Sequence, residues 1–193
     1  MNSGQEKNPK FGGLTKEQKE EVARAIHDNP GLALMIGNVR GAPLGYTVIE
    51  LEKGVEPWNT GFGDEHFDMV AVAGTLEKQP RNGVLRCVGE WRRILKPAGR
   101  LDLLVPNLRW ACISLVRGEF NEDWPGILAT LYGTQENEAE FHRTGFTLQM
   151  LRALLEGLGF TMKKATLAPW EIMCGENTIQ AEYVYLQAVK VGI

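Results

Sequence analysis

A strand–helix–strand unit spanning residues 67–106 constrains the fold of this chain most strongly. Residues 67–73, FDMVAVA, form a short apolar run that is typical of a buried strand. From residue 83 to 95 the apolar side chains recur with a helical period, and the KPAG sequence at 96–99 predicts the end of that helix. The apolar run at 101–106 predicts a second strand. Two strands joined through a helix lie parallel with a right-handed crossover, so the unit predicts an α/β protein with a mainly parallel sheet.

The segments on either side complete the expected sheet. Two apolar runs before the unit predict strands at 32–36 and 46–51, and the glycines and proline between them exclude a helix there. Thr15 begins a capping-box sequence and predicts a helix to residue 29. We expect residues 1–14 to be a flexible arm and residues 15–193 to form a single domain. After the unit, the sequence predicts two short helices within 108–135 broken near Gly118 and Pro125, a helix capped by Thr147 and ended by Gly159, and two strands at 160–167 and 182–191.

Charge and hydropathy restrict the classes of function. The 193 residues carry 21 basic and 24 acidic side chains, a net charge of −3, with no basic run, which argues against a nucleic-acid partner. No apolar stretch approaches the ~20 residues that cross a bilayer, and the polar N-terminus does not resemble a signal peptide. The three cysteines are odd in number and contain no CxxC pair, which predicts a cytoplasmic protein with no metal site.

Four stretches between residues 60 and 160 carry a more specific signal. They are GDEHFDMV at 63–70, TLEK at 75–78, WRRILKPAGRL at 91–101 with VPN at 105–107, and a tail of YGTQ at 132–135, FHRTGFT at 141–147 and residues 151–160. In this order and spacing they resemble class I S-adenosylmethionine (SAM)-dependent methyltransferases, particularly the short type 11-like group. The resemblance implies a Rossmann-like, seven-stranded, mainly parallel sheet with an antiparallel last strand, shortened here in its N-terminal half.

The resemblance also implies SAM as the cofactor, bound over the carboxyl ends of the parallel strands. The matching glycine loop is Gly37-Asn38-Val39, in which Val39 stands at the family's second glycine. Residues 41–46 are similar to a loop of short members that lack the first crossover helix. Gly37 has an alternative as a strand-ending turn, and Glu50 is either a ligand of the ribose hydroxyls or a solvated strand end. The implied cofactor-binding residues are Gly37, Asn38, Glu50, Ala73 and Gly74.

Two features near this expected site depart from the family pattern. Lys78 stands where the family has a histidine, and a lysine beside a cationic cofactor is unfavourable unless its side chain reaches solvent. Only 15 residues separate Leu51 from Phe67, which is tight for a further strand and its helices. Within them, Trp58 and Phe62 are candidates either to sandwich an adenine or to pad the edge of the sheet.

Three residues are candidates for the acceptor side of the site. His142 is the candidate catalytic residue, because an oxygen or nitrogen acceptor needs a base and histidine suits that role near neutral pH. Its structural alternative is a loop histidine that caps the following helix. Asn107 follows a strand at the edge where α/β sheets bind ligands, and it is a candidate substrate-binding residue. Tyr132, like Trp110, is a candidate to line an apolar acceptor site.

Two functions from different classes follow from these features. The first is SAM-dependent methyl transfer to a small molecule, a glycan or a lipid precursor. The second is a catalytically inactive methyltransferase-like protein that acts as a binding or partner subunit, as a homodimer or with another protein. Val39, Lys78 and the missing crossover helix favour the second. A nicotinamide dehydrogenase is disfavoured, because no GxGxxG sequence follows a predicted strand.

Overall fold

The described residues form one six-stranded sheet in the order β2-β1-β3-β4-β6-β5. The arm at 1–14 and the helix predicted at 15–29 lie outside the described residues, so the division into an arm and one domain stays a prediction. The structure, a computed structural model, describes residues 33–37, 46–49, 56–118, 124–174 and 177–192.

The sheet is parallel except at one side. β1 pairs in parallel with β2 and β3, β3 pairs in parallel with β4, and β6 runs antiparallel to both β4 and β5. This confirms the mainly parallel sheet with an antiparallel hairpin. The resemblance implied seven strands, but the described residues contain six, and those between β2 and β3 form only an isolated bridge of Glu56 with Asn59. The strands are β1 (Ala33–Ile36), β2 (Tyr46–Ile49), β3 (Phe67–Ala73), β4 (Leu95–Pro106), β5 (Phe160–Cys174) and β6 (Asn177–Lys190).

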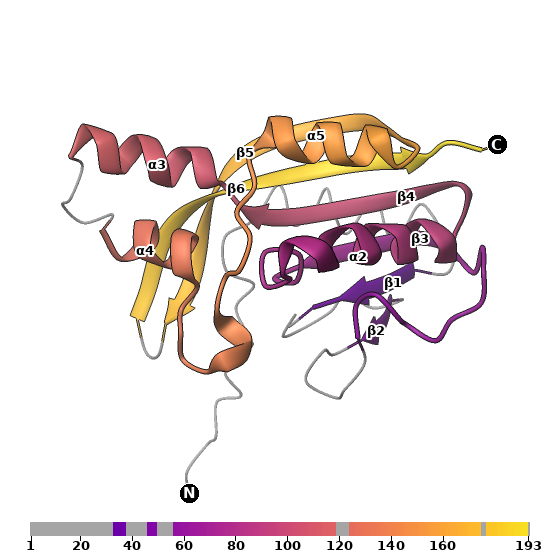
Figure 1. Ribbon diagram of the computed structural model, residues 1–193, viewed down its shortest axis with the longest axis horizontal. Coiled ribbons are helices and arrows are strands. Elements are labelled where there is room, and N and C mark those ends of the chain that lie inside the picture. The colour runs from indigo at the N-terminus through magenta and orange to yellow at the C-terminus, as the bar shows by residue number, and fades with distance from the viewer. Residues whose placement is uncertain (1–32, 38–45, 50–55, 119–123, 175–176, 193) are drawn as a thin grey trace, which may run out of the picture.

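Helices α2 (Arg81–Ile94) and α5 (Leu148–Gly157) cover one face of the sheet (Figure 1). Their apolar sides belong to a single core cluster, in which Trp91 of α2 and Leu151 of α5 are fully buried against the strands. Thr147 caps α5 as predicted, since its hydroxyl accepts the backbone N–H of Met150 at 3.2 Å, and Gly159 has φ +77 just after the helix. The fold is thereby held mainly by burial of these two amphipathic helices.

The KPAG sequence has a different form from the one predicted. Helix α2 ends at Ile94 and β4 begins directly, with Leu95 already paired to β3. The pairing then jumps from Leu95 to Arg100, so residues 96–99 bulge out of β4, with Ala98 at φ +61. A bulge bends a strand without ending it, which makes β4 longer than the predicted strand.

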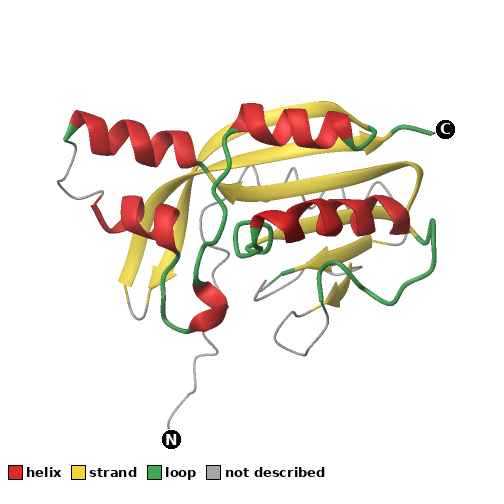
Figure 2. Ribbon diagram, in the orientation of Figure 1, coloured by secondary structure: helices red, strands yellow, loops and turns green. Residues whose placement is uncertain are grey.

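Two further helices and the end of the β5–β6 hairpin lie beyond the carboxyl end of β4 (Figure 2). They are α3 (Leu108–Arg117) and α4 (Trp124–Tyr132), which confirms the predicted break between two short helices. A Cβ on Gly126 would lie 1.7 Å from the carbonyl oxygen of Gln180, so α4 packs its backbone directly onto β6. The short 3₁₀ helix η2 (Glu138–Glu140) follows α4, and we call residues 133–146 the η2 arm. No helix in the described ranges is long and apolar enough to cross a membrane.

Candidate functional site

The carboxyl ends of β1, β3 and β4 lie at the same edge of the sheet, because these strands are parallel neighbours. Gly37 follows β1, Gly74 follows β3 and Asn107 follows β4. Open α/β sheets bind ligands at this edge. The structure therefore brings Gly37, Ala73, Gly74 and Asn107 to one place, whereas Asn38 and Glu50 lie outside the described residues.

Gly37 and Gly74 both lack a side chain at this edge, and the structure gives a different reason for glycine at each position. Gly37 has φ +132, and a Cβ there would lie 1.9 Å from the carbonyl oxygen of Ala73. This contact requires glycine at position 37 whatever else binds nearby. Gly74 has φ +63, and a Cβ there would meet no atom of the described residues within 4 Å. Among the described residues, the backbone after β3 therefore faces open space, where another molecule can approach it closely.

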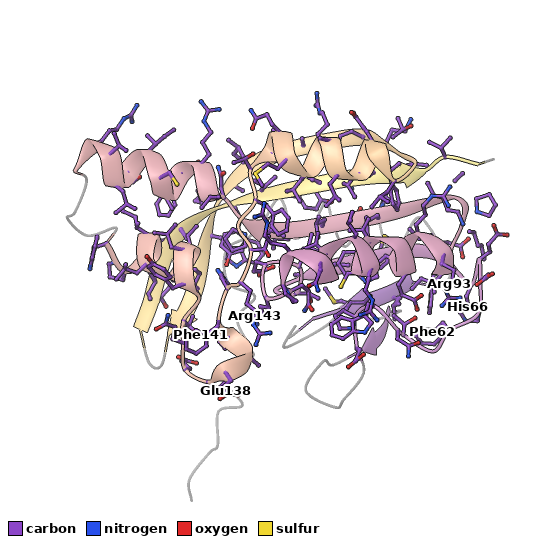
Figure 3. All side chains as sticks on the ribbon, in the orientation of Figure 1. Phe62, His66, Arg93, Glu138, Phe141 and Arg143 are labelled. Carbon is purple, nitrogen blue, oxygen red and sulfur yellow. The ribbon has the colours of Figure 1, made fainter. Side chains whose placement is uncertain are left out.

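Glu77 joins the loop after β3 to the η2 arm. Its carbonyl oxygen accepts hydrogen bonds from the backbone N–H groups of Arg143 and Thr144, at 2.8 and 3.0 Å. The Thr144 hydroxyl also donates to the carbonyl of Gln79 at 2.7 Å. Three hydrogen bonds therefore fix the segment around His142 against the loop after β3, and Figure 3 shows Arg143 of the η2 arm near the start of α2.

The Glu77 side chain is buried without full hydrogen bonding. The residue is 2% exposed, and its Oε2 atom has no hydrogen-bond partner in the described part of the chain. A buried polar atom left unpaired costs roughly 1–3 kcal/mol, and more when it is charged. Burial raises the pKa of the Glu77 carboxyl, and nearby His142 acts in the opposite direction by favouring the carboxylate. Such buried, perturbed carboxyls occur preferentially at functional sites.

His142 is held in one tautomer. Its Nδ1 lies 3.0 Å from the carbonyl oxygen of Thr130 in the last turn of α4, and its backbone N–H donates to the carbonyl of Tyr132. A carbonyl only accepts, so Nδ1 carries a proton, which leaves the lone pair of the neutral ring on Nε2. The imidazole thus hydrogen-bonds a carbonyl group of the preceding helix α4, while Thr147 caps the following helix α5. The alternative in which His142 caps α5 is therefore wrong. The catalytic role of His142 stays a prediction.

The charge of Lys78 is balanced within the protein. Its Nζ lies 2.9 Å from Oε1 of Glu140, and the two side chains are 14% and 21% exposed. The sequence suggested that a lysine here should point to solvent. Instead the η2 arm supplies a carboxylate, which removes the unfavourable electrostatic effect of a lone cation at this edge.

Asn107 is fully engaged within the fold. Its Oδ1 accepts the backbone N–H of Arg109 and so caps α3, while its Nδ2 donates to Oε1 of Glu182 at 2.6 Å. The residue is 3% exposed. Its role in substrate binding stays a prediction that these contacts do not require.

The two aromatic candidates lie on different helices. Tyr132 ends α4 with 54% of its surface exposed, and Trp110 on α3 is half-buried. Phe141 of the η2 arm adds a third aromatic ring, 41% exposed. In the described residues, exposed aromatic side chains therefore lie on α4 and on the η2 arm, and Phe141 directly precedes His142 in the sequence.

Trp58 and Phe62 were candidates either to sandwich an adenine or to pad the edge of the sheet. Both rings are partly buried and pack against the main core, and Phe62 meets Phe67 edge-on at 4.8 Å. Figure 3 shows Phe62, His66 and Arg93 at the far end of the molecule from Arg143. This packing agrees with padding of the sheet, the adenine-binding alternative stays a prediction, and His66 is exposed. No group of three metal-ligating side chains occurs in the described residues.

Two residues of the site were not singled out from the sequence. Glu77 was part of the quoted TLEK motif but had no role of its own, and Tyr183 was only part of a predicted strand. Tyr183 pairs with Pro106 at the end of β4, stacks on Trp170 at 5.5 Å and is 8% exposed. Burial raises the pKa of its phenol, and the charge of Glu77 raises it further. The position of Glu77 just after a buried strand was a usable signal, as it was for Asn107.

Comparison with solved structures assigns the fold. A SAM-dependent methyltransferase from Methanosarcina mazei matches with a TM-score of 0.61 and 22% identity, over 86% of this chain and 97% of that chain. The 1,6-didemethyltoxoflavin-N1-methyltransferase of Burkholderia thailandensis, solved with 1,6-didemethyltoxoflavin and S-adenosylhomocysteine, matches at 0.57 and 19%, over 89% and 76%. A SAM-dependent methyltransferase from Thermotoga maritima matches at 0.51 and 16%, over 87% of each chain.

At these identities the likeness is one of fold. The chain has the Rossmann-like fold of class I methyltransferases, which confirms the expectation from its sequence motifs. No protein-family model matches the sequence, and no curated protein matches it.

Proposed function

We propose that this chain binds SAM at the carboxyl ends of β1 and β3 and transfers its methyl group to a small-molecule acceptor. The observation that carries the proposal is the open backbone of Gly74 after β3, beside Gly37 at the end of the neighbouring parallel strand β1, in a fold shared with SAM-dependent methyltransferases. The residues proposed to hold the cofactor are Gly37, Asn38, Glu50, Ala73 and Gly74.

The electrostatics of the site support a cationic cofactor. Bound SAM supplies an electrophilic methyl group on a positively charged sulfur. Lys78, the basic residue of the loop at 74–80, is paired with Glu140, and Glu77 adds a buried carboxyl. The chain therefore presents no unbalanced positive charge in the loop after β3.

His142 is the proposed base, and Asn107 and Tyr132 are the proposed acceptor-side residues. The fixed tautomer of His142 leaves Nε2 able to take a proton. Methyl transfer depends mainly on alignment of the acceptor with the methyl carbon, which a rigid η2 arm favours. We expect a cytoplasmic protein, and a homodimer or a partner protein stays a prediction.

Binding of S-adenosylhomocysteine tests the proposal. A ligand at 100 times its Kd stabilises a protein by roughly 2.7 kcal/mol, which is a rise in Tm of about 5–10 °C for a domain of this size. We expect such a shift with S-adenosylhomocysteine. No shift at millimolar concentration contradicts the proposal and favours the inactive, partner-binding alternative.

A matched pair of variants locates the binding site. Gly74 and Gly61 both have positive φ, +63 and +77, and at neither position would a Cβ meet an atom within 4 Å. Asparagine tolerates this backbone region, so Gly74→Asn and Gly61→Asn should cost similar stability. Only Gly74→Asn places a side chain at the proposed cofactor edge. We expect it alone to weaken S-adenosylhomocysteine binding, by tenfold or more.

A further inference from the structure

Unpaired buried polar atoms concentrate around the junction of β3, α4 and the η2 arm. Of the six such atoms in the described residues, the Arg100 Nε and Asp102 Oδ1 atoms lie 3.1 Å apart and compensate each other. Three of the remaining four belong to residues of this junction. They are Oε2 of Glu77, Oγ1 of Thr130, whose carbonyl holds His142, and Oγ1 of Thr134 just after α4.

The groups around Glu77 do not supply the missing donor. Lys78 is committed to Glu140 at 2.9 Å. The N–H groups of Arg143 and Thr144 donate to the carbonyl of Glu77 and not to its carboxylate. The carboxylate is therefore buried with one oxygen available, in a segment that three hydrogen bonds hold in place.

Besides Lys78 and Glu140, the described residues that interact electrostatically with this carboxylate include His142 and Tyr183. In its neutral form, His142 presents a lone pair at Nε2, because Nδ1 donates to the carbonyl oxygen of Thr130. Tyr183, which feels the Glu77 charge, packs against Trp170. A buried carboxylate oxygen without a donor, in electrostatic contact with a histidine, matches a ligand that donates hydrogen bonds. The aromatic rings of Tyr183 and Trp170 suit a ligand with an apolar body.

We propose that Glu77 is an acceptor-binding residue, whose Oε2 receives a hydrogen bond from an N–H or O–H group of the methyl acceptor. This inference rests on the proposed methyltransferase function and narrows its substrate class. The acceptor is a nitrogen or oxygen nucleophile that arrives with a proton to lose. A thioether or a tertiary amine lacks the donor that Glu77 requires.

The proposal fixes where the proton goes. As the acceptor nitrogen or oxygen forms its bond to the methyl carbon, the carbon–sulfur bond breaks with its electron pair left on sulfur. The proton of the acceptor passes to Nε2 of His142, and the Glu77 carboxylate stabilises the resulting imidazolium. Atoms and charge balance without a further co-reactant.

Small probes test the requirement for a donor without knowledge of the natural acceptor. Phenol and benzylamine each carry a donor, while anisole and benzyltrimethylammonium are their methylated counterparts. We would measure binding of all four by ligand-observed NMR, with and without saturating S-adenosylhomocysteine. The proteins are the wild type, Glu77→Gln and the matched control Glu138→Gln, which changes an exposed glutamate of the same arm.

We expect the wild type and Glu138→Gln to prefer each donor probe at least fivefold over its methylated counterpart, and Glu77→Gln to lose the preference. Equal binding within each pair, binding of no probe at millimolar concentration, or an unchanged preference in Glu77→Gln overturns the proposal. If S-adenosylhomocysteine itself fails to bind, the proposed function fails, and the probe pairs without it still test the role of Glu77.

A second readout needs no ligand at all. The carboxyl carbon of Glu77 can be titrated by NMR in ¹³C-labelled protein, where the titratable groups that act on it include Lys78, Glu140, His142 and Tyr183. Because His142 favours the carboxylate, His142→Gln should raise the pKa of Glu77 above its wild-type value, while the exposed-site variant His66→Gln should not. The same pKa in all three proteins overturns the pairing of Glu77 with His142.

Discussion

Lys78 and Glu140 form an ion pair across 62 residues of chain, with Nζ and Oε1 2.9 Å apart. The pair links the loop after β3 to the η2 arm and cancels a positive charge beside the proposed cofactor site. Both side chains are less than a quarter exposed, so solvent screens the pair only in part.

Loss of Glu140 should therefore discriminate between two forms of the cofactor. SAM carries a positive sulfur, and S-adenosylhomocysteine does not. We expect Glu140→Gln to weaken SAM binding several-fold, because Lys78 is then uncompensated, and to change S-adenosylhomocysteine binding less than twofold. Calorimetric titration of both ligands checks this, with Lys78→Gln as the control that should not weaken SAM. Equal losses for the two ligands would show that the pair acts on structure and not on charge.

Gly37 should be indispensable to folding. A Cβ there would lie 1.9 Å from the carbonyl of Ala73 at a φ of +132, so Gly37→Ala must move β1 or the end of β3. We expect a loss of roughly 2–4 kcal/mol in the free energy of unfolding, from overpacking together with backbone strain. Gly63→Ala is the control, since Gly63 has open space around its Cβ position and no positive φ. Urea denaturation measures both, and a loss below ~1 kcal/mol for Gly37→Ala would contradict the close contact.

Glu77 should make the protein less stable as the pH rises. Burial raises its pKa in the folded state above the ordinary value of 4.5. The folded state then binds more protons than the unfolded state, so stability falls with increasing pH from about 4.5 up to the folded-state pKa. Glu77→Met, which removes the charge at similar volume, should gain on the order of 1–2 kcal/mol at pH 8 relative to wild type and little at pH 4.

The prediction is tested by how the difference in free energy of unfolding between Glu77→Met and the wild type changes with pH. Asp102 is also buried with a raised pKa, so the wild-type curve alone mixes two carboxyls. Subtracting the Glu77→Met curve removes the Asp102 contribution, since both proteins share it. Glu138→Met, at an exposed site, should show no pH-dependent gain. A flat difference between wild type and Glu77→Met from pH 4 to pH 8 would contradict a buried carboxylate.

The contact between α4 and β6 should limit the size of residue 126. A Cβ on Gly126 would lie 1.7 Å from the carbonyl of Gln180, so Gly126→Ala must push α4 away from β6. We expect a loss of roughly 1–3 kcal/mol. Gly89→Ala in the exposed interior of α2 is the matched helical control and should gain about 1 kcal/mol. A gain in both variants would show that α4 can be repositioned without cost.

The sequence predicted those elements that bury an apolar face. β3 has the predicted bounds of 67–73, because its alternation and flanking turns are both local signals. β5 and β6 extend well beyond their predicted limits. Their outer halves pair with each other beyond the end of β4, where residues such as Glu171 and Gln180 face no continuous core, so hydrophobic patterning did not reveal them.

The sequence could predict where the backbone of the candidate site lies, but not which side chains meet there. Gly37 and Gly74 follow strands, so their shared edge follows from parallel topology. The proximity of Glu77 to His142 depends on how the η2 arm returns to β3 through contacts more than 60 residues apart in sequence. No local sequence pattern indicates that the η2 arm folds back to β3. The sequence therefore identified His142 as a candidate, but not Glu77.

The strand order has a consequence for synthesis on the ribosome. β6 is made after the other five described strands, yet it lies between β4 and β5, so β5 has no place in the sheet until β6 has emerged. The final residue of β6, Lys190, donates to the carbonyl of Leu95 at 2.6 Å and locks the newest part of the chain onto the start of β4. A nascent chain that still lacks β6 also lacks Tyr183 and the surface on which α4 rests. Assembly of the site therefore waits for β6, and a chain that is cut before residue 190 leaves the edge of β4 open to pairing with other chains.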